Sequence, residues 1–243
     1  MTADSIYSFK KCLMVLILTG MVLISVGRAQ ENPQEILAKV NALYSSIDDY
    51  AATVTLSVNI TNFRMPKKIV KVFYKKPNKF SMKTDGFAMM PKVGVFPVPS
   101  NFIPADAQVM YNHSETLKGI RYHVLDVKPK ESDKKDSEIS LWINSKRWTI
   151  DRVILGVKDS GSSEVNLHYR QIEGKWLPDS TVVTLNYKKG IPKLDRPSIE
   201  RPIDDPDVPR VNVESLSGTV RLIFSDVVIN SGLDDSFFET EEK

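Results

Sequence analysis

The alternation of apolar and polar residues constrains the fold of this chain more than any other feature of its sequence. From Ala52 to Ile60 every even position is apolar, and every odd position is threonine, serine or asparagine. A period of two residues places the two classes on opposite faces of a β-strand. The stretch therefore predicts a strand with one dry face and one solvated face.

Nine further segments of similar character follow, and short runs rich in Asn, Asp, Gly, Pro and Ser separate them. Many closely spaced strands joined by short turns favour an antiparallel sheet, and a long sheet tends to curl or close. We therefore expect a mainly β fold, an incomplete and strongly curved antiparallel β-barrel of about ten to eleven strands. The further strands are expected at 69–75, 79–84, 108–111, 122–127, 138–144, 148–158, 164–171, 180–187 and 218–229, with turns that include 112–113 and 173–174.

One amphipathic helix is expected before the first strand. Asn32 can cap it, Pro33 suits its first position, and Glu35 stands three residues after the cap. We expect this helix, together with loops, to cover part of the concave apolar face of the sheet. Its apolar stripe consists of Ile36, Leu37, Val40, Leu43, Tyr44 and Ile47, and Asp48-Asp49 is expected to end it.

The first residues have the layout of a secretory signal peptide. Lys10 and Lys11 precede an uncharged apolar run over 13–26, and small residues stand at Gly27 and Ala29. The run is shorter than the ~20 apolar residues of a membrane-spanning helix, so a retained anchor is the second interpretation. We expect a signal peptide at 1–29, a single domain at 30–243, and a chain that is soluble in the periplasm after cleavage.

Cysteine usage and charge limit what the exported chain can be. Cys12, the only cysteine, lies before the apolar run, which is the wrong place for lipid attachment, and cleavage would remove it. The exported chain must then be stabilised by a hydrophobic core instead of disulfides. Loss of residues 1–29 lowers the formal net charge from +3 to +1, because three basic residues and one acidic residue leave with the segment. That balance does not argue for nucleic acid or an anionic membrane as a partner.

The sequence shows no recognisable catalytic or metal-binding motif. His113, His123 and His168 do not stand at metal-ligand spacing, and no nucleophile elbow, phosphate-binding loop or dinucleotide fingerprint is present. We therefore predict neither an enzyme nor a cofactor. A hydrolase built from scattered carboxylates ranks last among the functions considered. Three tryptophans could stack on sugars but are more typical of core positions: Trp142, Trp148 and Trp176.

Two stretches depart from the strand pattern. Residues 86–104 are apolar and contain four prolines, which suits either an irregular segment packed on the core or a mobile flap over an apolar opening. As a flap, its ligand contacts would be Met89, Met90, Phe96 and Phe102. Residues 191–209 contain five prolines and the acidic cluster Asp204, Asp205 and Asp207, and we interpret them as a solvated loop instead of a calcium site.

Three segments together resemble the LolA-like family of periplasmic carriers of outer-membrane lipoproteins. They are the helix EILAKVNALYSSIDDY before the alternating strand, the strand VKVFYKKPNKFSMK with its K-P-N-K-F turn, and the ending VRLIFSDVVINSGLDDSFF. The resemblance spans the chain from the helix to the C-terminus. It implies an incomplete barrel whose apolar concave side shields the acyl chains of a lipid or lipoprotein.

The resemblance also implies site residues and partners. Candidates for the cavity lining are the apolar faces of the strands, although the same residues could simply fill a core: Val54, Leu56, Val58, Val72, Phe80 and Met82. Lys76 matches an arginine that reaches toward the lid in well-studied carriers. The implied partners are an acyl lipid or lipoprotein cargo, an inner-membrane donor complex and an outer-membrane acceptor. A module related to envelope-stress regulators, binding lipoprotein or a membrane protein without catalysis, is the alternative.

Overall fold

The computed structural model describes residues 31–61, 63–77, 79–85, 98–104, 106–129, 137–188 and 215–238. Residues Asn32–Lys243 form one compact unit, and the expected signal peptide lies outside the described residues. The helical elements are α2 (Pro33–Tyr44) and the short 3₁₀ helices η1 (Pro99–Asn101) and η3 (Asp235–Phe238). The strands are β1 (Asp49–Ile60), β2 (Phe63–Lys75), β3 (Lys79–Thr84), β4 (Gln108–Leu117), β5 (Ile120–Lys128), β6 (Ser137–Asn144), β7 (Ile150–Val157), β8 (Gly161–Ile172), β9 (Lys175–Tyr187) and β10 (Leu216–Ile229).

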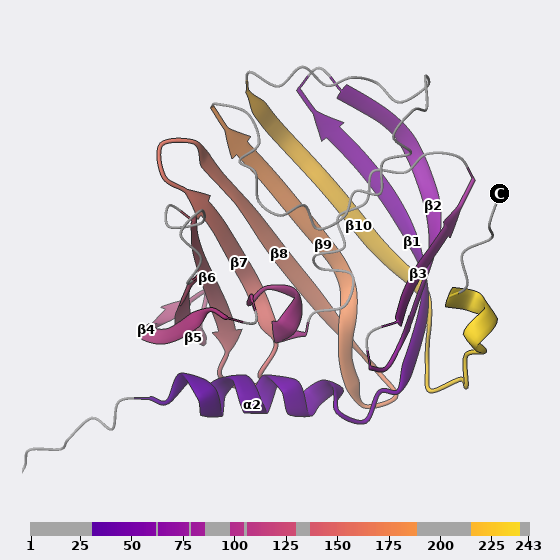
Figure 1. The fold of residues 1–243 in the computed structure, drawn as a ribbon, viewed down its shortest axis with the longest axis horizontal. Coiled ribbons are helices and arrows are strands. Elements are labelled where there is room, and N and C mark those ends of the chain that lie inside the picture. Colours follow the sequence, from indigo (N-terminus) through magenta and orange to yellow (C-terminus); the bar gives the residue numbers. More distant parts are fainter. Residues whose placement is uncertain are drawn as a thin grey trace, which may run out of the picture. The chain divides into compact units, whose positions relative to one another are not determined.

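The ten strands form one antiparallel sheet, in the order β3-β2-β1-β10-β9-β8-β7-β6-β5-β4. Every neighbouring pair is consecutive in sequence except β1 and β10, the first and last strands, which pair with each other inside the sheet (Figure 1). β3 and β4 form the two edges and do not pair with each other, so the sheet is not closed. The prediction of an incomplete, curved antiparallel barrel with an N-terminal helix is confirmed.

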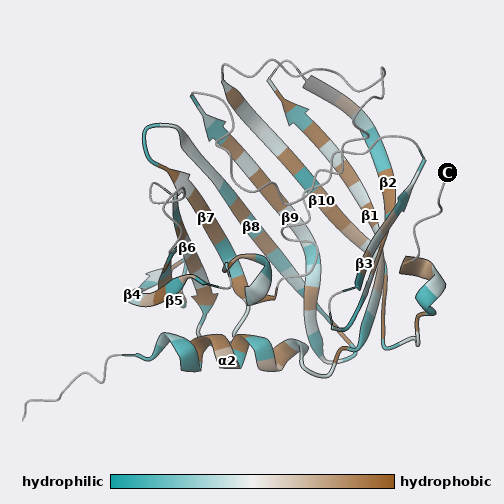
Figure 2. Cartoon of the chain, viewed as in Figure 1, coloured by the Kyte–Doolittle hydropathy of each residue, from teal (hydrophilic) through white to brown (hydrophobic). Residues whose placement is uncertain are grey.

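The predicted dry and wet faces of the first strand are also confirmed. The even positions of β1 from Ala52 to Ile60 are all buried, with at most 5% of each residue exposed. The odd positions between them are more accessible. Bands of apolar and polar residues alternate along the strands of the whole sheet (Figure 2). Because the same alternation recurs in register on neighbouring strands, one face of the sheet is apolar.

The helix begins where the sequence predicts and ends earlier. The side chain of Asn32 accepts a hydrogen bond from the backbone N–H of Gln34 at 3.0 Å, and Pro33 occupies the first turn. The helix stops at Tyr44, before the expected Ile47, which is nevertheless fully buried. Ser45 donates its hydroxyl to the carbonyl of Ala42 at 2.9 Å, a local bond of the kind that competes with helix continuation. α2 contacts β4 and η1 at one end of the sheet (Figure 1).

The expected turn at 112–113 is wrong. β4 continues through these residues to Leu117, and the reversal occurs at Lys118 and Gly119. Both residues have positive φ, 50° and 77°, as a tight two-residue hairpin turn requires. A register shift between Tyr111 and His113 absorbs the irregularity inside the strand. Asn112 therefore marks a β-bulge, where its side-chain amide donates to Asp126 at 2.6 Å.

The start of β1 is tied to the segment that follows β10. The carboxylate of Asp49 accepts hydrogen bonds from the backbone N–H and hydroxyl of Ser231 and from the N–H groups of Gly232 and Leu233, at 2.8–3.3 Å. Burial alone would raise the pKa of Asp49, but these donors outweigh it and hold that pKa below its usual range. The start of the first strand is thus joined to the segment that follows the last strand.

Candidate ligand-binding face

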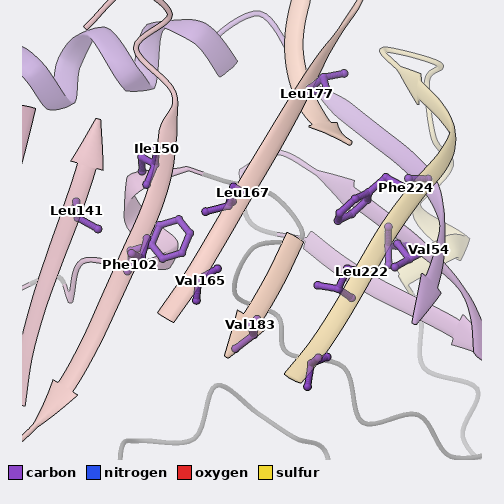
Figure 3. Close-up of a cluster of buried hydrophobic side chains, with 14 of the residues drawn as sticks. Val54, Phe102, Leu141, Ile150, Val165, Leu167, Leu177, Val183, Leu222 and Phe224 are labelled. Carbon is purple, nitrogen blue, oxygen red and sulfur yellow. The ribbon is translucent and has the colours of Figure 1, made fainter. Parts of the chain in front are cut away.

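The apolar face of the sheet is the candidate binding surface. Side chains from β1, β2 and β5–β10, together with α2 and η1, form one buried apolar cluster. β3 and β4 add partly buried apolar side chains that pack against it. Figure 3 shows apolar side chains of β1 and β6–β10 together with the ring of Phe102, which follows η1. We call this surface the inner face, and it extends across all ten strands.

The structure brings six of the predicted lining residues together at one end of the inner face. Val54, Leu56 and Val58 lie on β1, opposite Phe224, Leu222 and Val220 of β10. Val72 of β2 lies opposite Met82 of β3, and Phe80 lies opposite Tyr74. The β1 valines, Leu56 and Val72 are buried, whereas Phe80 and Met82 are only partly buried. The two β3 side chains are therefore the most accessible of the six.

The predicted flap is only partly within the described residues. Met89, Met90 and Phe96 lie outside them, so their contact with a ligand stays a prediction. Phe102 follows η1 and is buried, with 4% of its surface exposed. Figure 3 places its ring near Ile150 and Val165, on a different part of the inner face from Val54. At Phe102 the segment therefore packs on the core.

Lys76 lies beside the end of the helix, where the family resemblance suggested a lid contact. Its ammonium group donates to the carbonyl of Ser45 at 2.5 Å and lies 3.2 Å from the carboxylate of Asp48. Asn230 fastens the same segment, because its side chain accepts from the N–H of Asp48 at 2.7 Å and donates to the carbonyl of Ser46 at 2.9 Å. These contacts hold the connection between α2 and β1. A role for Lys76 in ligand binding stays a prediction.

A polar cluster near the helix was not found by sequence reasoning. Asp151 of β7 accepts hydrogen bonds from Tyr122 at 3.2 Å, Asn144 at 3.1 Å and Arg147 at 2.7 Å. Desolvation and the nearby carboxylate raise the pKa of Tyr122 to about 12. The one available signal was the Asn-Ser-Lys-Arg turn before β7, which gives no indication that Arg147 and Asp151 pair. Within this cluster the charge of Arg147 is paired with that of Asp151.

Two tyrosine hydroxyls lie next to this cluster at the apolar inner face. Tyr44 of α2 is buried, and Tyr169 of β8 is partly buried against the same core and donates to the carbonyl of Ile150 at 2.5 Å. Desolvation raises the pKa of both phenols well above 10, so both are neutral at physiological pH. The helix end of the inner face therefore carries neutral hydroxyl groups within an otherwise apolar surface.

The helix is attached to the sheet by a second contact, which involves Trp148. The ammonium group of Lys39 lies 4.2 Å from the centroid of the Trp148 indole. The indole of Trp148 is also stacked on the imidazole of His123. Their ring centroids are 5.4 Å apart and the angle between the ring planes is 6°. Trp148 adopts a left-handed backbone conformation with φ of 60°, which is uncommon for a bulky residue. Trp148, which the sequence analysis treated as more typical of a core position, thus connects β5 to α2.

We searched the described residues for metal-binding side-chain groups and for membrane-spanning helices. No group of three or more His, Cys, Asp or Glu side chains is arranged to hold a metal ion there. Within the same residues, no helix combines the length and apolar character needed to cross a membrane.

Comparison with solved structures identifies the fold. A DUF1329 family protein from Desulfovibrio piger superimposes with a TM-score of 0.55 at 12% identity, covering 84% of this chain and 95% of that one. An outer-membrane lipoprotein-sorting protein domain from Vibrio parahaemolyticus gives 0.56 at 11% identity, covering 84% and 94%. A LolA superfamily protein from Nitrosomonas europaea gives 0.50 at 12% identity, covering 85% and 97%. No family model and no curated protein sequence matches the chain.

The chain therefore has a LolA-like fold, as the resemblance of its sequence predicted. Each of the three superpositions covers at least 84% of this chain and at least 94% of the other. At identities of 11–12% the likeness establishes the fold and leaves the ligand to be inferred from the chain itself.

Proposed function

We propose that this protein is a periplasmic carrier that shields the acyl chains of a lipid or lipoprotein on the inner face of its open sheet, during transfer towards the outer membrane. The observation that carries the proposal is the extent of the inner face, which presents apolar side chains from all ten strands, including both unpaired edges. A two-layer sandwich would bury such a face against a second sheet. An open sheet can admit a flexible ligand from its edge.

The chemistry of the inner face suits a hydrocarbon ligand. Each methylene group that leaves water contributes ~0.8 kcal/mol, so an acyl chain is held by contact area and needs no specific polar partner. The carrier must also release its cargo, which favours side chains that change shape readily. Met82 on the edge strand β3 is partly buried and has a flexible, unbranched side chain. It is therefore the described residue that best meets both requirements.

The first test is mass spectrometry on organic extracts of residues 30–243, purified without detergent from a bacterial periplasm. A stoichiometric acyl lipid or lipoprotein, absent from an unrelated exported protein, is the expected result. A clean extract, together with no binding of an added fluorescent fatty acid, would contradict carriage of acyl chains. It would leave a non-enzymatic protein-binding module as the better description.

Substitutions on opposite faces of the neighbouring strands β3 and β2 test the position of the ligand. Met82→Asp places a carboxylate on the inner face and should lower the affinity for a fluorescent fatty acid at least tenfold. Ile69→Asp makes the same kind of change on β2, where the side chain is 65% exposed on the other face, and should leave the affinity unchanged. The double substitution Met89→Asp and Met90→Asp tests the flap, and unchanged uptake would exclude those two residues as a gate.

A further inference from the structure

The face of the sheet opposite to the inner face carries a cluster of cations and exposed isoleucines. Thr55 of β1 points away from the buried side, and it pairs with Ile69 of β2 and with Ile223 of β10. The two isoleucines therefore flank Thr55 in one row across three strands, with 65% and 47% of their surfaces exposed. These are two of only four large hydrophobic residues that are exposed in the described part of the chain.

Cations surround this apolar row. Lys71 lies two residues after Ile69 on β2 and shares its face, and its partner across to β3 is Lys83. Arg221 lies two residues before Ile223 on β10. All three cations are exposed. We call the set Ile69, Lys71, Lys83, Arg221 and Ile223 the basic face.

The directly opposed lysines need an anion. Like charges at facing positions of neighbouring strands are destabilising. The same hairpin contains a second pair of this kind, Lys75 opposite Lys79, and there the chain supplies the counter-charge itself. Asp235 of η3 lies 2.7 Å from the ammonium of Lys75 and 2.8 Å from that of Lys79.

The Lys71–Lys83 pair has no such carboxylate among the described residues. The nearest recorded partner of Lys83 is the ring of Phe237, 5.2 Å from its ammonium group, and aromatic rings carry no net charge. η3 covers the neighbouring part of this face, since Phe237 packs on Phe73 with their ring centroids 4.9 Å apart. Among the described residues, η3 thus covers and neutralises one end of the hairpin, whereas the cations of the basic face stay exposed.

We propose that the basic face binds the surface of an anionic phospholipid bilayer. Phosphate groups supply the missing counter-charge for Lys71, Lys83 and Arg221, while Ile69 and Ile223 reach the boundary between headgroups and acyl chains. Lysine side chains suit this role because their long stems follow the apolar surface while the ammonium groups stay in the polar layer. A net charge near zero is a sum over the chain, and it does not show that cations gather on one face.

This inference does not depend on the proposed carriage of acyl chains, because the basic face and the inner face lie on opposite sides of the sheet. A carrier of any ligand that docks on a bilayer through its outer face leaves its inner face and both sheet edges accessible. The binding should be weak and reversible, since each cation near an anionic surface contributes about 1 kcal/mol, or roughly fivefold in affinity.

The test is co-sedimentation of residues 30–243, which contain the whole compact unit, with vesicles of phosphatidylcholine that contain or lack phosphatidylglycerol. We expect binding only with phosphatidylglycerol, and a decline as salt rises above about 0.15 M, where the screening length falls below about 8 Å. The variant Lys71→Gln/Lys83→Gln should bind roughly 25-fold more weakly. Ile69→Ser/Ile223→Ser should weaken binding while leaving its salt dependence intact.

A matched control has the same change in net charge elsewhere. Lys118→Gln/Lys158→Gln removes two exposed cations from the β4–β5 and β7–β8 turns and should bind as the unmodified protein does. Equal binding to both kinds of vesicle, or equal losses in the two lysine variants, would refute the proposal. Absence of vesicle binding, together with binding of a polyglutamate probe that Lys71→Gln/Lys83→Gln removes, would refute it in favour of an acidic protein partner. Urea unfolding of each variant separates loss of binding from loss of folding.

Discussion

The carboxylate of Asp49 should make one of the largest single contributions to stability in this fold. The residue is 4% exposed, and its two oxygens accept four hydrogen bonds from the segment after β10. Three of these donors are backbone N–H groups, which have no alternative partner within the strands. A buried donor left without an acceptor costs about 1–3 kcal/mol. We expect Asp49→Ala to lower the free energy of unfolding by about 3–5 kcal/mol, a large part of the usual stability of a domain.

Asp49→Asn separates charge from shape at the same position. The amide keeps one acceptor oxygen and directs its own N–H groups toward donors, so we expect a loss of about 2 kcal/mol at pH 7. The folded-state pKa of Asp49 is depressed, so its contribution is fully present above the unfolded pKa of about 3.9 and disappears as pH falls through the folded pKa. The difference between the unmodified protein and Asp49→Asn should therefore shrink as the pH is lowered below about 4.

The adjacent residue provides the control. The side chain of Asp48 is 79% exposed and pairs with Lys76 at 3.2 Å. An exposed ion pair contributes little, so Asp48→Asn should lower the free energy of unfolding by less than about 0.5 kcal/mol. Urea unfolding followed by tryptophan fluorescence between pH 3 and pH 7 measures all three variants. If Asp49→Asn and Asp48→Asn unfold at the same urea concentration at pH 7, the carboxylate does not fasten the C-terminal segment to the sheet.

Two further predictions concern the sheet and the helix. Gly161→Ala should prevent folding or destabilise the protein severely, because the new Cβ would lie 2.0 Å from the carbonyl oxygen of Asn186. Gly156→Ala is the control and should fold normally, since the nearest atom to its new Cβ would be 3.7 Å away. Circular dichroism during heating compares the two variants, and equal melting temperatures would contradict the prediction. Lys39→Met removes the cation above Trp148 and should weaken the attachment of α2 to the sheet by about 0.5–1 kcal/mol. Amide hydrogen exchange in α2 should become faster, and unchanged exchange would show that this contact does not hold the helix.

The sequence by itself determined the strand content and the two faces of the sheet. In β1 the alternation from Ala52 to Ile60 admits one assignment, because a shift of one residue would expose every apolar side chain. Local chemistry also placed the helix start, since the Asn32 cap and Pro33 act within their own turn. The turn at Glu173-Gly174 was equally local, and both residues adopt the positive φ expected there. Structure that depends on interactions between residues close in the chain could thus be predicted from the sequence.

Local signals misled where another part of the fold decided the outcome. Asn112 and His113 have the composition of a turn, yet they lie inside β4 because pairing with β5 continues through a bulge to Leu117. The helix likewise stops at Tyr44 although Ile47 continues its apolar spacing. Ile47 is fully buried without being helical. Burial requires an apolar side chain at that position but does not fix the backbone conformation.

Only the tertiary structure decided which residues distant in sequence meet. The pairing of β1 with β10 joins Thr53 to Ser225, and no local pattern records that contact. It is this pairing that places Ile69 and Ile223 in one row, and the docking of η3 that neutralises Lys75 and Lys79 while leaving Lys71 and Lys83 open. The periodicity of a strand fixes which way a side chain points. Its neighbours depend on the order of the strands, which is set by the packing of the whole sheet.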